Sequence, residues 1–136
     1  MNIYAPIDPV SRECFFSDLH EWTWNQQPTI LAGDFNCVQS PPLDRLGGVR
    51  QGRPKRKALR TVMEAHHLED ARILSESVDG EGDDLDPIDF HTYWGPDSAS
   101  HIDRFYVPQA WSSVVQWVSV HEPRVPSDHQ RVQLHY

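Results

Sequence analysis

The sequence predicts an α/β (α+β) fold, in which a mixed β-sheet is covered by helices on one face. In the first half of the chain, short apolar runs alternate with segments whose apolar residues recur at helical spacing. The second half consists mostly of segments that alternate apolar and polar residues, which is typical of strands. With 136 residues, no internal repeat and no linker, the chain is expected to form one domain, residues 1–136.

Two strands and two helices are predicted in the first half. Short apolar runs bounded by proline or glycine predict strands over residues 2–5 and 29–33. Apolar residues at helical spacing predict helices over residues 12–25, capped by Ser11, and over residues 55–67, after Pro54.

A β-hairpin is predicted in the second half, from residues 88–94 and 101–107 with a turn at Gly95-Pro96-Asp97. The alternation in the second arm places Arg104 and Tyr106 on one side and Asp103 on the other. Further strands are expected over residues 68–71, 114–120 and 132–135. Proline and glycine predict a loop over residues 38–53, and residues 73–78 fit either a helix or a strand.

The charge distribution gives opposing indications about nucleic acid. The net charge of −8 disfavours a polyanionic partner, but residues 45–60 contain seven of the twelve basic residues and no acidic one. This segment either contacts phosphates or is a solvated loop and helix start. The candidate DNA-binding residues are Arg45, Arg50, Arg53, Lys55, Arg56 and Lys57. Residues 79–89 are acidic and lack the closing glutamate of a calcium loop, so we expect a disordered loop there.

Composition excludes several classes of protein. No run of about 18 apolar residues is present, so no membrane span is predicted, and the N-terminus has no signal-like core. Cys14 and Cys37 match no zinc spacing and are expected to be free thiols in a reducing compartment. We therefore expect an intracellular protein and leave open whether it is nuclear.

Candidate catalytic residues follow the strand at residues 29–33. Asp34 and Asn36 lie on the same side of the extended chain, with Phe35 opposite. An aspartate and an asparagine at the end of a strand suit the activation of water and the support of a developing oxyanion. The alternative is an ordinary turn, because Gly-Asp and Asp-x-Asn are common in loops.

Other polar residues also stand at strand ends or within the hairpin. Asp103 lies in an apolar strand, where a carboxylate is costly unless it is paired, and His129 is a natural partner. Ser127-Asp128-His129 also fits a simple turn, and Tyr4 also fits a packed ring. Thr92 lies inside the hairpin.

Five motifs resemble, in order, those of the endonuclease/exonuclease/phosphatase superfamily, which includes exonuclease III. They are N-I-Y-A-P at 2–6, G-D-F-N at 33–36, H-T-Y-W at 91–94, I-D-R-F at 102–105 and S-D-H at 127–129. The resemblance is closest to the endonuclease domains of LINE-type (non-LTR) retrotransposons, to which Leu43-Asp44-Arg45 is also similar. It covers residues 2–136.

The resemblance implies a role for each candidate residue in hydrolysis of a phosphodiester. Asp34 would position and deprotonate the attacking water, while Asn36 and Tyr4 would bind phosphate oxygens. His129, oriented by Asp103, would stabilise the phosphorane or the leaving oxygen. Asp128 would assist a weakly bound Mg²⁺ or Mn²⁺ ion, and Thr92 would support the phosphate.

The resemblance also implies that residues 1–136 form the C-terminal half of a four-layer DNase I-like α/β sandwich. The family motifs that bear an asparagine and the glutamate that is the chief metal ligand would precede Met1. We therefore expect weak or absent DNA cleavage. We also expect an uncovered sheet face with exposed groups such as Ile30, Phe35 and Ile102, which favours self-association.

Two alternative functions remain open at this point. A phosphatase of the same superfamily, acting on inositol lipids or sphingolipids, fits I-D-R-F and S-D-H. A catalytically silent module could instead bind DNA, through its phosphate backbone, or a protein partner.

Overall fold

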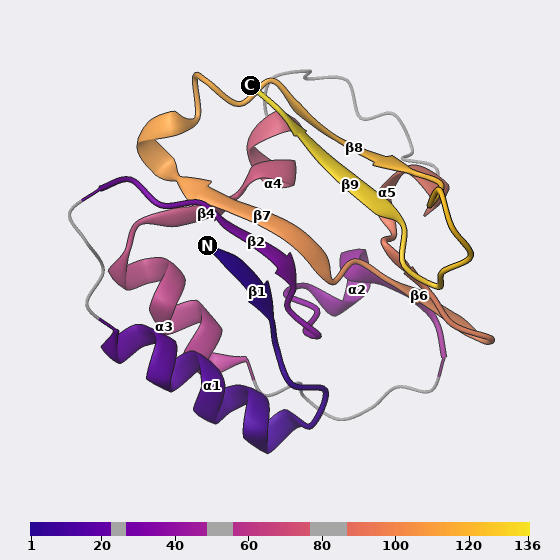
Figure 1. Ribbon diagram of the computed structural model, residues 1–136, viewed down its shortest axis with the longest axis horizontal. Coiled ribbons are helices and arrows are strands. Elements are labelled where there is room, and N and C mark those ends of the chain that lie inside the picture. Colours follow the sequence, from indigo (N-terminus) through magenta and orange to yellow (C-terminus); the bar gives the residue numbers. More distant parts are fainter. Residues whose placement is uncertain (23–26, 49–55, 77–86) are drawn as a thin grey trace.

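A computed structural model describes residues 1–22, 27–48, 56–76 and 87–136 of the chain. It contains a four-stranded sheet, a three-stranded sheet and a two-stranded sheet, with helices between the strands (Figure 1). Arg50, Arg53, Lys55 and most of the acidic segment 79–89 lie outside the described residues. No described helix is long and apolar enough to cross a membrane.

The central sheet is mixed, as the sequence predicts. Its strands are β1 (Asn2–Tyr4), β2 (Leu31–Asp34), β7 (Asp103–Pro108) and β4 (Leu68–Asp70), in the spatial order β1-β2-β7-β4. β1 runs parallel to β2, whereas β7 is antiparallel to both β2 and β4. The predicted α/β class with a mixed sheet is therefore confirmed.

Gly33 permits the close approach of β1 and β2. Its φ is +138°, and a Cβ at this position would lie 1.9 Å from the Ile3 carbonyl oxygen. No side chain fits there, so only glycine can stand immediately before Asp34. The parallel register then places Tyr4 beside Asp34.

Helices α1 (Pro9–Glu21) and α3 (Lys57–Ala65) pack side by side on one face of the central sheet (Figure 1). The α1 helix begins before the predicted Ser11 cap, because Asp8 caps it instead. The Asp8 carboxylate accepts a 2.8 Å hydrogen bond from the Ser11 amide, and Pro9 suits the first helical turn.

An apolar core lies between these two helices and the sheet. It contains Ile3, Phe16, Leu31, Phe35, Leu59, Val62 and Tyr106. The rings of Phe35 and Tyr106 meet edge to face, with centroids 4.8 Å apart. The core therefore anchors the residues immediately around Asp34 and along β7.

The segment predicted as a loop contains regular structure. A short helix, α2 (Pro41–Asp44), and a strand, β3 (Arg45–Gly47), lie within residues 38–53. Pro41 occupies the first helical turn, and Gly47 has a φ of +71°, which ends the strand. The prolines and glycines thus bound these elements rather than prevent them.

The predicted hairpin forms with different partners. The first predicted arm instead forms the short helix α5 (Pro87–Phe90), followed by the two-residue strand β5 (Tyr93–Trp94). Because the turn falls at residues 95–97, β5 pairs with the adjacent β6 (Ser98–Ser100). β3 is the third strand of this small sheet. β7, the predicted partner of β5, instead pairs with β2 and β4 in the central sheet.

The last two strands cover part of the second face of the central sheet. The helix α4 (Ala71–Glu76) and the 3-10 helix η1 (Gln109–Trp111) come earlier in the sequence than these strands. The strands β8 (Trp117–His121) and β9 (Arg131–His135) are antiparallel to each other. Their apolar side chains, including Val118 and Leu134, pack with Val107 and Ile30.

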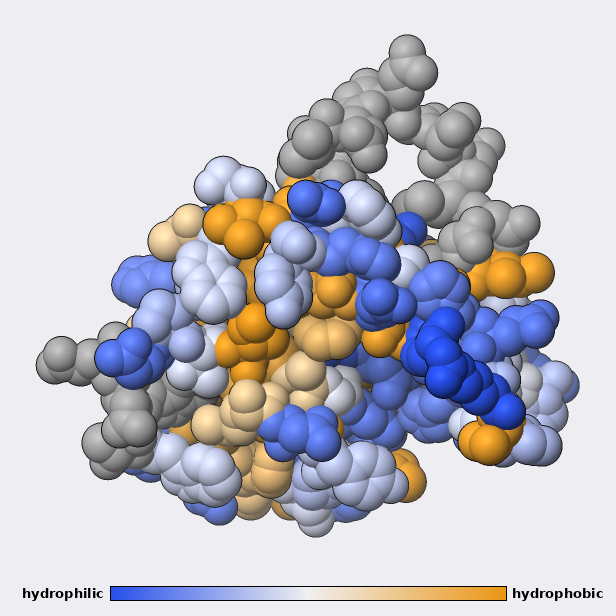
Figure 2. Space-filling view, turned by 45° about the horizontal axis from the view of Figure 1, so that its top comes forward, coloured by the Kyte–Doolittle hydropathy of each residue, from blue (hydrophilic) through white to orange (hydrophobic). Residues whose placement is uncertain are grey.

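The expected exposure of the second sheet face is correct only in part. Phe35 and Ile102 are buried, at 0% and 8% exposure, and Ile30 is half-buried. An apolar groove of about 190 Å³ remains, lined by Ile30, Val107, Trp111, Val114, Val115, Leu134 and Tyr136. Figure 2 shows apolar side chains gathered near the middle of one face of the molecule. Self-association through this region stays a prediction.

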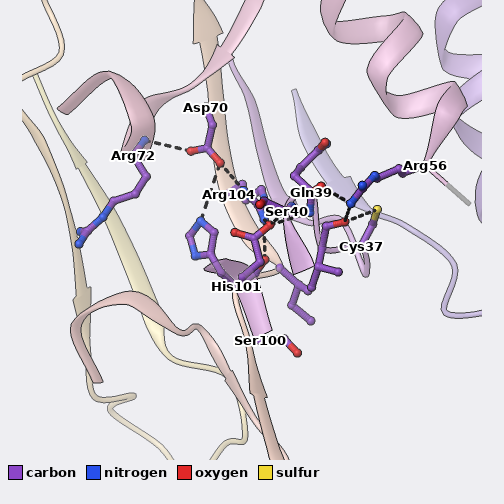
Figure 3. A network of polar contacts seen from close by, with 12 residues as sticks. Cys37, Gln39, Ser40, Arg56, Asp70, Arg72, Ser100, His101 and Arg104 are labelled. Atoms are coloured by element: carbon purple, nitrogen blue, oxygen red, sulfur yellow. Dashed lines mark hydrogen bonds and ion pairs between the residues drawn. The ribbon is translucent and has the colours of Figure 1, made fainter. Parts of the chain in front are cut away.

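A buried ion network fastens β7 to its surroundings. Arg104 on β7 is 3% exposed, and its guanidinium donates to the carboxylates of Asp44 and Asp70 and, at 2.8 Å, to the His101 carbonyl. Figure 3 shows Asp70, His101 and Arg104 converging beside Ser40. Burial alone would raise the pKa of Asp70, but the His101 imidazole, whose Nε2 lies 3.8 Å from the carboxylate, and the Arg104 charge outweigh it and hold this pKa at about 2.

We predict that Arg104→Ala destabilises the domain by about 3–5 kcal/mol, because it leaves two carboxylates buried without their cation. Urea unfolding followed by circular dichroism measures this change. Arg60→Ala, on the exposed side of α3, is the matched control and is expected to change the free energy of unfolding by less than about 0.5 kcal/mol. Equal stabilities of the two variants would contradict the structural role of the network.

Candidate active site

Three side chains from distant parts of the sequence meet beyond the carboxyl end of β2. They are Asp34 at the end of β2, Asp103 at the start of β7 and His129 just before β9. One ligand atom from each of them lies within 4.8 Å of the others. The sequence therefore correctly predicts that these residues lie close together.

His129 lies between the two carboxylates. Its Nδ1 atom is 2.9 Å from Asp103 Oδ2, and its Nε2 atom is 3.9 Å from Asp34 Oδ2. The hydrogen bond to Asp103 directs Nε2 toward Asp34, because the two ring nitrogens point in opposite directions. Partial burial alone would lower the pKa of His129, but that hydrogen bond and the negative charges of Asp103 and Asp34 raise it.

Asp34 has the properties of a general base. Burial and the nearby Asp103 charge raise its pKa, while a 2.8 Å hydrogen bond from the Asn36 amide to Oδ1 opposes the shift. The second carboxylate oxygen, Oδ2, faces His129. A raised pKa makes this carboxylate a stronger base than an ordinary aspartate, which is the property that proton abstraction from water requires.

Asn36 lies beside Asp34, as the sequence predicts, although β2 ends at Asp34. Its φ of +46° is a conformation that asparagine tolerates better than most residues. One amide hydrogen of its side chain is donated to the Ala5 carbonyl at 2.7 Å, which links it to the end of β1. Phe35 between them is fully buried, so the predicted separation of the polar and apolar side chains is confirmed.

Thr92 supports the site from below the surface. It is fully buried, and its hydroxyl oxygen accepts hydrogen bonds from the Ile102 amide at 3.1 Å and the Asp103 amide at 3.0 Å. A direct contact with a phosphate does not fit this burial. Thr92 instead holds the backbone that carries Asp103.

Tyr4 and Asp128 lie at the rim of the site. Tyr4 is 76% exposed, next to Asp34 in the parallel register of β1 and β2. Asp128 is exposed, and its carbonyl accepts a 2.8 Å hydrogen bond from the Trp94 amide. Asp128 was predicted as the metal ligand, but among the described residues the group that could hold an ion consists of Asp34, Asp103 and His129.

Sequence reasoning missed Tyr93. Its ring lies 5.1 Å from the His129 ring, and the two residues form an isolated β-bridge. This contact packs the Tyr93 ring against the imidazole. The predicted hairpin offered no signal for it, because the bridge joins residues 36 positions apart.

The predicted DNA-binding residues that the structure describes differ in their availability. Arg56 donates to the Gln39 carbonyl and, at 3.5 Å, to the Val38 carbonyl, so it holds the loop after β2. Arg45 is half-buried and Lys57 is exposed. Arg50, Arg53 and Lys55 are not among the described residues.

A family model described as Endonuclease/Exonuclease/phosphatase family matches residues 2–129. No curated protein sequence matches the chain. The chain is similar in structure to a 3'-5' exonuclease (NExo) from Neisseria meningitidis, with a TM-score of 0.71 and 18% identity over 99% of this chain and 60% of that one.

Two further solved structures are similar to the chain. One is the catalytic domain of Xenopus laevis APE2, with a TM-score of 0.66 and 16% identity over 98% of this chain and 49% of that one. The other is the AP endonuclease LMAP from Leishmania major, with a TM-score of 0.59 and 18% identity over 93% and 41%. The chain thus spans about 41–60% of the length of these proteins, and the likeness shows a shared fold.

We predict that Asp103→Asn lowers the pKa of His129, because the substitution removes the nearest negative charge and leaves partial burial to dominate. The imidazole signals of His129, followed by NMR across pH 5–9, measure this pKa. Asp128→Asn removes a more weakly acting charge and is expected to give a smaller decrease. An unchanged His129 pKa in Asp103→Asn would contradict the pairing.

Proposed function

The chain belongs to the endonuclease/exonuclease/phosphatase family, and from that premise we propose that it carries the C-terminal half of a metal-dependent DNA endonuclease domain of LINE-type retrotransposon origin. One observation supports hydrolysis at this site above all. Two carboxylates and an imidazole, brought together from residues 34, 103 and 129, lie within 4.8 Å of one another. The motifs around residues 2–6 and 43–45 support the retrotransposon origin.

In this proposal, Asp34 acts as the base that accepts a proton from the attacking water. The hydroxide oxygen bonds to phosphorus as the bond to the leaving ester oxygen breaks. Protonated His129 donates through Nε2 to the charge that develops on the phosphate oxygens, and Asp103 keeps the ring in this orientation. The leaving oxygen takes up a proton from solvent and Asp34 returns its proton to solvent, so that the products are a phosphate monoester and an alcohol.

Asn36 and Tyr4 would bind the scissile phosphate. The Asn36 side chain has one amide hydrogen engaged with Ala5, which leaves its second hydrogen for a phosphate oxygen. The exposed Tyr4 hydroxyl approaches from the neighbouring strand. Both residues adjoin Asp34, so a phosphate bound here would lie beside the base.

The residues present fit a divalent ion. Asp34 and Asp103 offer carboxylate oxygens, which suit Mg²⁺ and Mn²⁺, while His129, protonated in this proposal, would lie beside the ion as a hydrogen-bond donor. Such an ion would neutralise charge on the phosphate oxygens. Because the set has only two carboxylates and Mg²⁺ prefers six oxygen ligands, we expect residues 1–136 to hold Mg²⁺ weakly.

We predict slow nicking of supercoiled plasmid by the 136-residue polypeptide in Mg²⁺ or Mn²⁺, and a decrease of about 100-fold in Asp34→Asn. The decrease reflects loss of the base, and gel analysis of nicked circles over time measures it. Asp18→Asn, a carboxylate on α1 away from the cluster, is the matched control and should retain the rate.

Equal nicking by Asp34→Asn and the original chain, or none by either, would contradict catalysis by this polypeptide. Phosphate release from a soluble inositol polyphosphate, in the absence of nicking, would favour a phosphatase. Binding of DNA without cleavage would favour a catalytically silent module.

We predict that the chain binds double-stranded DNA with an affinity that decreases as salt increases, because basic residues of segment 45–60 release counterions from phosphates. Fluorescence anisotropy from 50 to 200 mM salt measures the slope of log affinity against log salt. Lys57→Ala should reduce this slope by about one, whereas Arg131→Ala, on β9, should not change it. A salt-independent affinity would remove the basic segment from the interface.

A further inference from the structure

A second cluster of histidines lies on the two-stranded sheet formed by β8 and β9. Ser119 and His121 are two residues apart on β8, so their side chains point to the same face. In the antiparallel register His135 is opposite Trp117 and is therefore the diagonal neighbour of Ser119 on that face. The apolar side chains of Val118 and Leu134 point the other way, into the core.

The two imidazoles converge on a single hydroxyl group. Ser119 Oγ is 2.8 Å from His121 Nε2 and 2.9 Å from His135 Nε2. A serine hydroxyl has one proton, so it donates to one ring and accepts an N–H bond from the other. Both Nε2 atoms therefore face the same small region, so that a turn of each ring would allow them to share one ion.

The surrounding contacts hold His135 in this orientation. Its ring stacks on Trp117, with centroids 4.5 Å apart and an interplanar angle of 21°. His135 and His121 are both half-buried, and the strand pairing on either side fixes their backbones. A ring already held in place loses less freedom on binding a ligand than a mobile one.

We propose that His121 and His135 chelate a divalent first-row transition ion such as Zn²⁺, at a site separate from the Asp34, Asp103 and His129 cluster. The position of Oγ itself lies one covalent bond from Ser119 Cβ, so the ion would lie between the two nitrogens on the outer side of the hydroxyl group. Zinc–nitrogen bonds are about 2.0–2.1 Å, so both rings would turn toward the ion as it binds.

The donor set determines which ion the site takes. Imidazole nitrogens suit Zn²⁺, Ni²⁺ and Cu²⁺, whereas Mg²⁺ prefers oxygen ligands, so excess Mg²⁺ should not compete. Arg131 is paired with His121 in the register, and its positive charge on the same face opposes a bound cation. Two nitrogens and water make this an open site of moderate affinity.

Zinc titration tests the proposal in the His129→Gln variant, which lacks the imidazole of the candidate active site. On addition of one equivalent of Zn²⁺, we expect the Nε2 resonances of His121 and His135 to shift together in long-range ¹H–¹⁵N spectra. About 10 mM Mg²⁺ is present throughout, because Mg²⁺ binds imidazole poorly and should not compete for this site. Separate titration of the two rings, or no shift, would overturn the proposal.

Variants of the cluster separate chelation from simple hydrogen bonding. His121→Gln and His135→Gln should each weaken zinc affinity about tenfold or more in calorimetry, whereas His67→Asn, an exposed histidine at the end of α3, should not. Ser119→Asp adds a carboxylate at the point of convergence and should tighten binding about tenfold. Such a gain cannot arise from misfolding, and weaker or unchanged binding in Ser119→Asp would count against the site.

Discussion

The buried guanidinium of Arg104 is the constraint on which the rest of the fold depends. It joins three segments of the chain, because it contacts Asp44 at the end of α2, Asp70 at the end of β4 and the carbonyl of His101. Asp44 in turn accepts the Gln39 and Ser40 amides, each at 2.7 Å. A cation buried this deeply is tolerated only where carboxylates surround it, so the network admits one arrangement of these segments.

This arrangement also determines the geometry of the candidate active site. Asp103 and Arg104 are adjacent on β7 and point to opposite faces, so a strand held by Arg104 on one side presents Asp103 on the other. Thr92 fixes the same stretch through the Asp103 amide. His129 then takes its orientation from Asp103 and approaches Asp34. Burial and the Asp103 charge together raise the pKa of Asp34, whereas for His129 burial alone would lower the pKa but the neighbouring carboxylates outweigh it.

The parts of the fold that follow local patterns could be predicted from the sequence. Local patterns predict the helices and the strands around residues 2–4 and 31–34. The short sequence motifs predict the convergence of Asp34 with His129. β5 pairs with β6 and not with residues 101–107, because β7 pairs with β2 in the central sheet. The alternation of apolar and polar residues predicts a strand but does not specify its partner strand. Likewise, the roles of Thr92 and Tyr93 depend on distant contacts, and Asp44 in a proline-rich stretch gave no sign of its partner Arg104.

Tyr136 lines the apolar groove, and Met1 is hydrogen-bonded to another of its lining residues. The amino group of Met1 donates to the Ile30 carbonyl at 2.7 Å, and Ile30 and Tyr136 line the same groove. A polypeptide fused to either terminus would therefore emerge beside this hydrophobic surface and could shield it from water.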